Sequence, residues 1–532
     1  MKVADYISGQ LASHGVRYVF GVPGGPSIPY LKSFREAGIE FILTSGESAA
    51  AVMAAVSARL TGITGVCHAT YGPGAVNLAS GTGGALLDRS PVIALTSETG
   101  SSMINRTTQM NIDHQKLFKP VTKATYRITP ETVPGVLSGA FLKCNEEYPG
   151  PVHIGLPSDI AGEETDGAAG IAPEEKKIYE GTEYGTERIV KLLQDSRRPL
   201  IAAGLSAFRH GIGRQLEAFL EQYRIPVVFT PMAKGILSEE HPSYAGVLFH
   251  ALSDYLEDIW SEADLIIGLG YDQVEYNYES WIPEVPLIHF DVKDTDLPEK
   301  GIVEHFTGPP AEWFRMLGNL NPGSLVFEKG LIRGVRDEME AVFKGFTGHF
   351  GPVAALSVLM EELPSDTIVT ADVGSHLHLA GQYWRSGPGG MLLMSNGWSG
   401  MGFGIPAALA ARLQYPQRSV ACITGDGGFL MTAGELMVAR RYNLPVITVV
   451  FSDGELNLIR LKQSWAGCEN YGTMLYNGNF FGSDIFLGIK VLHAGSSEEM
   501  SRAVNEAVSL EAPVIIEARI DPDDYRWLLT KG

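Results

Sequence analysis

The chain has 532 residues, of which 45% are hydrophobic and 19% are charged. This length exceeds what one hydrophobic core supports, so it predicts about three domains of ordinary size. The formal net charge of −20 and the lack of a basic stripe argue against nucleic acid as a partner. No apolar run approaches the roughly 20 residues that cross a bilayer, so no membrane contact is expected either.

The sequence holds four cysteines, which lie far apart and form no Cys-x-x-Cys pair. This spacing favours buried, reduced side chains over metal ligands or disulfides. Reduced thiols and the absence of a secretion signal predict a cytoplasmic protein. The first residues predict instead an amphipathic helix with Val3, Ile7 and Leu11 on one face.

Short apolar runs alternate with helical patterns along the whole chain, which is typical of parallel sheets covered by helices. We therefore expect an α/β protein of three doubly wound parallel-sheet domains, over residues 1–165, 185–335 and 350–532. A polar stretch over Ile160–Tyr184 is expected to link the first two domains. Strands are predicted at Tyr18–Gly21, Phe41–Thr44, Gly65–Thr70, Val92–Thr96, Val152–Leu156, Pro199–Ala203, Pro226–Thr230, Leu265–Gly268, Leu287–Phe290, Thr367–Thr370, Val420–Thr424, Val446–Phe451 and Val514–Ala518.

The first and third domains resemble each other in outline. Both close on a strand that a proline introduces, Pro151 in the first domain and Pro513 in the third. This is a weak internal repeat, and α/β proteins in general share enough features to produce it.

The turn Thr424–Phe429, which reads Thr-Gly-Asp-Gly-Gly-Phe, is the clearest local motif. It follows an apolar strand and precedes a helical pattern over Thr432–Tyr442. Glycines at such a turn let backbone N–H groups approach phosphate oxygens, and the helix N-terminus favours their negative charge. Asp426 can hold a hard cation such as Mg²⁺ against a diphosphate. The turn lacks the third glycine of a dinucleotide fingerprint.

The next predicted strand ends in Ser452-Asp453-Gly454-Glu455. Because the carboxyl ends of neighbouring parallel strands face one crevice, Asp453 is expected beside Asp426. A backbone carbonyl near Glu455 would add a third oxygen ligand. Two ordinary surface turns that carry acids are the alternative, and the matching strand ends favour the metal site.

With these motifs the chain resembles the thiamine diphosphate-dependent family that includes acetolactate synthases, pyruvate oxidases and 2-keto acid decarboxylases. The resemblance covers nearly the whole chain and is strongest to acetolactate synthases of the catabolic type. Three further segments carry it, namely Phe20–Gly25, Tyr71–Leu78 and Met401–Ala408. It implies a diphosphate on the C-terminal domain and an aminopyrimidine on the N-terminal domain, usually of a second subunit.

The resemblance assigns Glu47 to the essential glutamate, which shares a proton with the pyrimidine N1′. A solvated acid at a helix N-terminus is the alternative. The resemblance also implies that Met401 wedges under the cofactor and that the Ser399 carbonyl accepts from its 4′-amino group. The remaining residues implied at the cofactor are Pro73, Asn77, Gly374, Ser375, His376, Gly425, Gly427 and Gly428, with Asp426, Asp453 and Glu455 at the metal; His376 could equally be structural.

The sequence also departs from the family pattern. Aspartate stands at position 453, where asparagine is common, and it can still coordinate a metal. Ser45-Gly46 replaces the family's Arg-His before the glutamate. Met110 replaces a substrate-pocket glutamine, unless Gln109 takes that place. The residues expected in the substrate pocket are Pro23, Gly24, Gly25, Gln109, Met110 and His114.

The resemblance implies thiamine diphosphate and Mg²⁺ as cofactors, and a homodimer or homotetramer with sites at the subunit interface. Residues Gly270–Tyr276 differ from the flavin-contacting turn of relatives that carry FAD, so no FAD is expected. The segment Leu456–Asn479 is predicted to cover the site as a movable lid.

The expected activity is acetolactate synthase-like carboligation of a 2-oxo acid such as pyruvate. A decarboxylase, lyase or C–C hydrolase acting on another ketone is the alternative within the same cofactor class. A flavin-dependent oxidoreductase, similar to pyruvate oxidase, and a nicotinamide-dependent one are alternatives from another class. A non-catalytic subunit is disfavoured because Glu47, Asp426 and Asp453 are all present.

Overall fold

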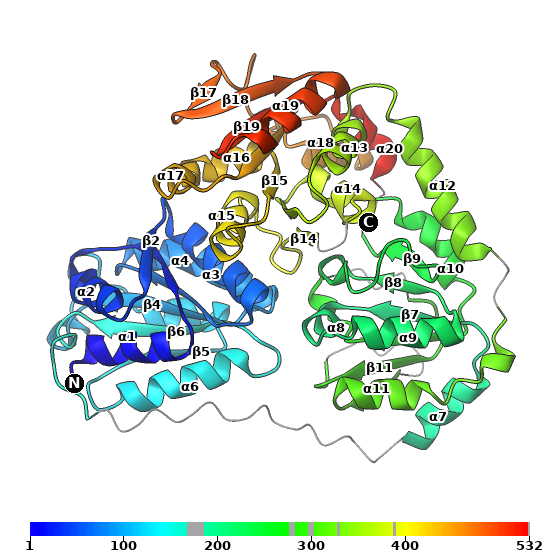
Figure 1. The fold of residues 1–532 in the computed structure, drawn as a ribbon. Coiled ribbons are helices and arrows are strands. Elements are labelled where there is room, and N and C mark those ends of the chain that lie inside the picture. Colours follow the sequence, from blue (N-terminus) through cyan, green and yellow to red (C-terminus); the bar gives the residue numbers. More distant parts are fainter. Residues whose placement is uncertain are drawn as a thin grey trace.

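The computed structural model describes residues 1–166, 186–249, 251–275, 282–295, 303–326, 330–386 and 390–529. It contains three sheets, each built from its own part of the chain, and this confirms the three α/β domains (Figure 1). The C-terminal domain, yellow to red, lies above the blue N-terminal domain and the green middle domain. Within the described residues, no helix combines the length and the apolar character needed to span a membrane.

The N-terminal domain has six parallel strands: β1 (Tyr18–Val22), β2 (Glu40–Leu43), β3 (Gly65–Ala69), β4 (Val92–Glu98), β5 (Ala124–Arg127) and β6 (Val152–Pro157). Their order in the sheet is β2-β1-β3-β4-β6-β5. The helices are α1 (Val3–Ser13), α2 (Ile28–Glu36), α3 (Glu47–Thr61), α4 (Pro73–Leu87), α5 (His114–Phe118) and α6 (Val133–Asn145).

The C-terminal domain has strands β13 (Ile368–Ala371), β14 (Met391–Leu393), β15 (Val420–Gly425), β16 (Ile447–Ser452), β17 (Ile485–Phe486), β18 (Ile489–Ala494) and β19 (Val514–Arg519). Their order is β14-β13-β15-β16-β19-β18-β17, and only the hairpin β17–β18 is antiparallel among the described pairs. Its helices are α13 (Pro352–Glu362), α14 (Ser375–Tyr383), α15 (Gly404–Gln414), α16 (Asp426–Thr432), η9 (Ala433–Glu435), α17 (Leu436–Arg441), α18 (Asn457–Trp465), α19 (Ser497–Ser509) and α20 (Tyr525–Leu528).

These two sheets share one topology, and this confirms the predicted internal repeat. In both, the second strand flanks the first, and the third and fourth follow on the other side. In both, the closing strand that a proline introduces, β6 or β19, lies next to the fourth strand. The C-terminal sheet differs by the added short strand β17.

The middle domain has strands β7 (Pro199–Ala203), β8 (Val227–Phe229), β9 (Tyr244–Val247), β10 (Leu265–Leu269), β11 (Leu287–Asp291) and β12 (Val303–Thr307). Their order, β12-β11-β10-β7-β8-β9, is that of a dinucleotide-binding sheet. The helices are α7 (Thr186–Asp195), α8 (Leu205–Arg209), α9 (Gly213–Tyr223), α10 (Glu257–Trp260), α11 (Pro310–Leu317) and α12 (Leu331–Gly345).

All the predicted strands are present, and the strands that sequence reasoning missed lie at or near sheet edges. The missed strands β5 and β12 carry polar residues such as Arg127 and Glu304, so they lack the apolar runs of central strands. Of the expected linker, residues 160–166 pack back on α1, where the Val3 amide donates to the Glu163 carbonyl at 3.0 Å. The rest of the linker lies outside the described residues. The exact domain boundaries stay a prediction.

The N-terminal and C-terminal domains share one hydrophobic core. Helix α3 packs on α15, and the two helices bring Ala50 and Met53 into one buried cluster with Ile405 and Leu409. Figure 1 shows α3 of the N-terminal domain beside α15 of the C-terminal domain.

Candidate functional site

The strand order of the C-terminal sheet reverses between β13 and β15, and ligands bind beyond the carboxyl ends of strands at such a point. Residues 372–376 follow β13, and Asp426 follows β15. The sequence predicted a turn here with a helix from residue 432. The helix α16 begins at Asp426 itself, so the glycines beside Asp426 expose N–H groups at a helix N-terminus.

The structure brings Asp426 and Asp453 together. The Asp426 Oδ2 atom accepts hydrogen bonds from the amides of Asp453 at 3.1 Å and Gly454 at 2.7 Å. The Asp426 Oδ1 atom accepts from the Gly427 amide at 2.8 Å. The two strand ends therefore meet at one carboxylate, as the parallel arrangement predicts.

The charge of Asp426 makes ionisation of the neighbouring Asp453 more costly. Burial raises the pKa of Asp426. Burial, and then the charge of Asp426, raise the pKa of Asp453 to about 7. Oxygen ligands held close together in a buried place are the donor set that a hard divalent cation prefers, and a cation would relieve their repulsion.

Glu455 has a side chain that is occupied by partners other than Asp426 and Asp453. Its amide donates to Asp453 Oδ1 at 3.1 Å, while its side chain pairs with Arg460 at 3.2 Å and accepts from Asn470 at 3.1 Å. A contact of Glu455 with a metal would therefore use its backbone carbonyl, as the sequence interpretation holds.

The segment predicted as a lid, Leu456–Asn479, contains α18 and then returns to the site. A bridge between Glu455 and Met474 fixes its return. The hydroxyl of Tyr476 then donates to Asp426 Oδ2 at 3.1 Å. Sequence reasoning placed Tyr476 in the predicted lid but did not predict its contact with Asp426, because that contact depends on where this segment turns back.

The turn Gly374–His376 lies opposite α16. A Cβ atom placed on Gly425 would lie 3.2 Å from the His376 ring, so glycine there lets the imidazole approach. Burial lowers the pKa of His376 to about 4. Among the described residues, the buried His376 Nε2 and Ser375 Oγ atoms have no hydrogen-bond partner. Unsatisfied polar atoms beside a glycine turn are what a diphosphate would meet.

Asp372 joins the three segments of this site, and sequence reasoning missed it. Its fully buried carboxylate accepts from the amides of Val373 at 2.7 Å and Gly402 at 2.8 Å, and from the Thr424 hydroxyl at 3.0 Å. A Cβ atom on Gly428 would lie 2.6 Å from Asp372 Oδ2. An aspartate at a strand end just before Gly374 was the available signal.

Met401 lies on the glycine turn of α16. A Cβ atom on Gly427 would lie 3.1 Å from Met401 Cε and 2.9 Å from Leu456 Cδ2. The approach to Met401 turns sharply, with a φ of 51° at Ser399, whose hydroxyl donates to the Asn396 carbonyl at 2.9 Å. The structure thus places Met401 against the glycine turn at the start of α16.

Glu47 is the first residue of α3 and is nearly buried, with 9% exposure. Its Oε2 atom accepts from Asn77 Nδ2 at 3.1 Å. A Cβ atom on Gly74 would lie 3.1 Å from Glu47 Oε1, so the first turn of α4, which Pro73 begins, closes directly onto this carboxylate. The structure therefore unites Glu47, Pro73 and Asn77.

Within one chain, Glu47 lies near η9. This short helix follows directly after α16, the helix that begins at Asp426. The Ser45 amide donates to Glu435 Oε2 at 3.0 Å, and the Ser45 hydroxyl donates to the Gly434 carbonyl at 2.7 Å. Burial raises the pKa of Glu435 to about 7, and the charge of Glu47 adds to this shift.

The expected substrate-pocket segments converge on the turn after β3. A Cβ atom on Gly24 would lie 2.3 Å from Thr70 Oγ1, which packs residues 23–25 onto that turn. A Cβ atom on Gly72 would lie 2.6 Å from the Met110 carbonyl. Met110 itself has a φ of 62°.

The other two pocket candidates differ in burial. Gln109 is exposed, and the neighbouring Met110 contacts the turn. His114 is buried beneath the turn, where its Nε2 atom accepts from the Gly72 amide at 3.3 Å.

Comparison with known proteins gives the same division of the chain. The N-terminal TPP binding domain of thiamine pyrophosphate enzymes matches residues 1–117, their central domain matches 186–306, and their C-terminal TPP binding domain matches 372–518. A "Probable acetolactate synthase large subunit" of Methanocaldococcus jannaschii is 30% identical over 564 residues, which cover 100% of this chain and 94% of that protein. The chain belongs to the thiamine pyrophosphate enzyme family.

Two further relatives of this thiamine pyrophosphate enzyme extend the comparison. A "Probable acetolactate synthase large subunit" of Methanococcus aeolicus is 29% identical over 567 residues, which cover 100% of this chain and 94% of that protein. The "Acetolactate synthase isozyme 2 large subunit" of Escherichia coli is 28% identical over 548 residues, which cover 99% and 97%. The matched N-terminal region contains Glu47 and Asn77, and the matched C-terminal region contains Asp426 and Asp453.

Proposed function

We propose that this thiamine pyrophosphate enzyme binds thiamine diphosphate with Mg²⁺ and carries out an acetolactate synthase-like carboligation. One 2-oxo acid, such as pyruvate, loses CO₂, and its remaining acyl carbon is joined to the carbonyl of a second 2-oxo acid. The observation that carries the proposal is the meeting of Asp426 and Asp453 at adjoining strand ends, beside a turn of glycines. The full-length similarity to proteins named acetolactate synthase supports the choice of reaction.

The Asp426 and Asp453 carboxylates and the Glu455 carbonyl would hold the cation. The buried Nε2 atom of His376, which lacks a partner among the described residues, would meet the diphosphate. The other contacts would come from Gly374, Ser375, Gly425, Gly427 and Gly428 at the diphosphate, from Ser399 and Met401 beneath the rings, and from Pro73, Asn77 and Glu47 at the pyrimidine.

When bound, thiamine diphosphate supplies a nucleophilic carbon that makes or breaks a bond beside a carbonyl. Glu47 would hold and return a proton at the pyrimidine, and the Asn77 amide orients its carboxylate at 3.1 Å. The part of Leu456–Asn479 that follows α18, which the Tyr476 hydroxyl attaches to Asp426, would exclude water from the site. Exclusion of water favours carboligation over simple protonation of the nucleophilic carbon. Pro23, Gly24, Gly25 and Met110 would line the substrate pocket beside this site.

We further propose that the active unit contains at least two copies of the chain, as a homodimer or homotetramer. In one chain the segment just before Glu47 contacts η9, and the cleft that unites Glu47 with Asp453 would form between copies. Symmetric two-copy assemblies are the commonest arrangement that achieves this.

We propose that the middle domain carries no FAD. Its sheet reverses between β7 and β10, where a dinucleotide would bind. The fully buried Glu275 side chain enters this point and accepts from the Leu205 amide at 3.1 Å, and also from Thr230 and Met232. A carboxylate of the chain itself thus uses the N–H groups that a phosphate would need.

The experiment that tests the reaction supplies the purified chain with thiamine diphosphate, Mg²⁺ and pyruvate alone, and identifies the product. Acetolactate supports the proposal. Acetaldehyde would refute it in favour of a 2-oxo acid decarboxylase, and no turnover of pyruvate would refute it in favour of a decarboxylase, lyase or C–C hydrolase that acts on another ketone. Omission of the cofactor from the same assay is the control.

A further inference from the structure

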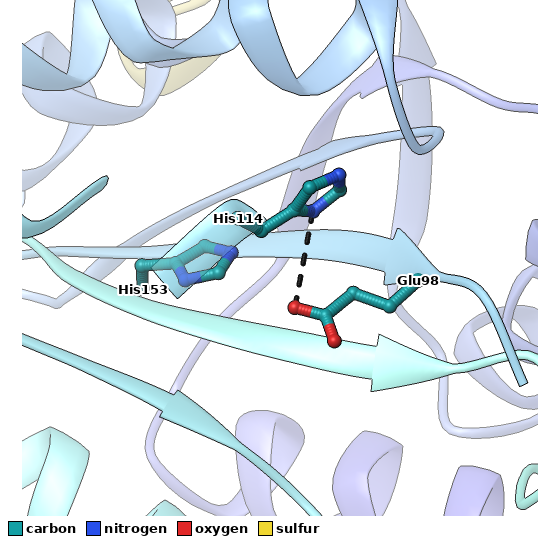
Figure 2. Close-up of side chains that lie close together, drawn as sticks. All are labelled: Glu98, His114 and His153. Carbon is teal, nitrogen blue, oxygen red and sulfur yellow. Dashed lines mark ion pairs between the residues drawn. The ribbon is translucent and has the colours of Figure 1, made fainter. Parts of the chain in front are cut away.

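Glu98, His114 and His153 form a buried cluster inside the N-terminal domain (Figure 2). Glu98 ends β4, His114 begins α5, and His153 lies on β6. Each offers an atom within 4.8 Å of the others, which is the spacing of a metal site. The His114 Nδ1 atom is 3.9 Å from Glu98 Oε1.

The hydrogen bonds of this cluster oppose metal binding. Glu98 Oε1 accepts from Gln115 at 2.7 Å, and Glu98 Oε2 accepts from Arg127 at 2.8 Å. All four ring nitrogens of His114 and His153 also have partners within the chain. A metal would have to break these contacts, since metal ligands need a free lone pair.

The partners fix the tautomer of each histidine. The Gly72 amide donates to His114 Nε2 at 3.3 Å, so the proton of the neutral His114 ring is on Nδ1. That Nδ1–H group donates to Thr96 Oγ1 at 2.8 Å, and the Thr96 hydroxyl donates to His153 Nε2 at 2.8 Å. His153 Nδ1–H then donates to Thr125 Oγ1 at 2.6 Å. Each hydrogen bond in this series, from Gly72 to Thr125, is donated in the direction that leads away from Gly72.

Both imidazole rings are held in the neutral form that this series of hydrogen bonds requires. Burial lowers the pKa of His114 to about 4 and lowers the pKa of His153 well below its ordinary value. The charged groups that face His114 are Asp113 at its own helix start and Glu98, which Arg127 pairs. The His153 ring is further fixed by stacking on Phe118, with centroids 4.0 Å apart.

The Gly72 amide is the first donor in this series of hydrogen bonds. It belongs to the turn that packs against Glu47. Gly72 has a φ of 67° and precedes α4. Two residues later, Gly74 lies against Glu47, and Asn77 on the next turn donates to the same carboxylate. The position of Gly72 therefore sets the approach of α4 to Glu47.

We propose that His114 is a positioning residue: its Nε2 atom holds the Gly72 turn over Glu47, and Thr96 and His153 hold His114 in the tautomer that can do so. This assigns the cluster to the support of the cofactor site instead of to a metal or to substrate contact. The functional part of the inference rests on the proposed function, whereas the hydrogen-bond chain does not.

A matched pair of substitutions separates the hydrogen bond from the space that the ring fills. In His114→Gln the side-chain oxygen reaches the position of Nε2 and can still accept from Gly72. In His114→Asn the amide reaches only the position of Nδ1, so the Gly72 amide loses its acceptor. Hydrogen–deuterium exchange of a peptide over residues 71–78, read by mass spectrometry in the full chain, reports on this bond.

We expect exchange about fivefold faster in His114→Asn, the effect of one net hydrogen bond, and within about twofold of the parent in His114→Gln. Equal exchange in the two variants would overturn the proposal. Thiamine diphosphate with Mg²⁺ should bind about fivefold more weakly to the Asn variant only. If the parent chain binds no thiamine diphosphate, the proposed function fails while the exchange result still decides the positioning role.

A measurement on the unsubstituted chain keeps the proposal testable if either variant fails to fold. Long-range nitrogen–proton NMR correlations of histidine-labelled protein distinguish the two neutral tautomers from each other and from the imidazolium form. We expect the Nδ1–H tautomer for both His114 and His153 at neutral pH. An Nε2–H tautomer, or a charged ring, at His114 would overturn the proposal.

Discussion

The backbone amide of Asp453 donates to the Oδ2 atom of Asp426 at 3.1 Å, so the carboxylate at the end of one strand orders the end of the next. The same oxygen accepts from Gly454 and Tyr476. Asp426 therefore organises both the turn and the return segment. The side chain that we propose as a cation ligand also supports its surroundings, so its loss should affect several contacts together.

Replacement of Asp426 by Ala removes the proposed cation ligand and the acceptor of four hydrogen bonds, from Gly427, Asp453, Gly454 and Tyr476. We expect the affinities for Mg²⁺ and for thiamine diphosphate to fall together by about tenfold or more, as loss of support around a metal site commonly does. Titration followed by calorimetry measures both. Asp337→Ala, on the exposed face of α12, is the control, and unchanged affinity in Asp426→Ala would refute the metal site.

Gly428→Ala tests the role of Asp372. The new Cβ atom would lie 2.6 Å from Asp372 Oδ2, which backbone amides hold in place, so either α16 or Asp372 must move. Such crowding costs about 1–3 kcal/mol, and we expect a lower melting temperature together with weaker cofactor binding. Gly334→Ala in α12 meets nothing within 4 Å and should be neutral or stabilising by up to about 1 kcal/mol. An equal effect of both substitutions would contradict this account.

Sequence reasoning found the features that depend on local pattern. Central strands are continuous apolar runs, and the proline before β6 and β19 revealed the repeat. The meeting of Asp426 with Asp453 followed from parallel strands alone. The roles assigned to both residues stay predictions.

The contacts that sequence reasoning missed join segments without a shared motif. Asp372 gathers loops that lie about thirty to fifty positions further along the chain, and only the packed fold brings them to one carboxylate. Tyr476 and Glu435 are similar cases, since each meets its partner across a turn or across two domains. Local pattern does not reveal the partners of Tyr476 and Glu435.

The stability of the chain should depend on pH through Glu435. Burial raises the pKa of Glu435 from 4.5 to about 7, so the folded state holds this proton more tightly than the unfolded state. Stability from this group is therefore greatest below about pH 4.5 and falls as the pH rises towards 7.

Glu435→Gln removes that ionisation and keeps an acceptor for the Ser45 amide. Relative to the parent, the variant should gain stability between pH 5 and pH 8, by up to about 3 kcal/mol for a shift of this size. Melting temperatures across this range measure the gain, with Glu338→Gln on exposed α12 as the control. Parallel curves for parent and variant would show that Glu435 does not titrate as described.

Glu47→Gln should separate cofactor binding from proton transfer. The amide keeps the size of the side chain and can still contact Asn77, so thiamine diphosphate should bind within a few fold of the parent. Loss of the acid should slow exchange of the cofactor's C2 proton by about a hundredfold or more, the usual contribution of a general acid or base. NMR of deuterium exchange measures this rate, and retained exchange would remove Glu47 from its assigned role.

The same variants decide whether the site forms between two copies of the chain. In one chain Glu47 lies near η9, and the metal residues lie at the strand ends. If each site takes Glu47 from one copy and Asp426 from another, a mixed pair of Glu47→Gln and Asp426→Ala chains has one intact site and one site with both defects. Chains with different affinity tags, produced together and purified through both tags, should then recover roughly a quarter to a half of the parent activity. If each site lies within one chain, every site in the mixed pair carries a defect and activity stays at the level of the single variants, which would exclude the two-copy proposal.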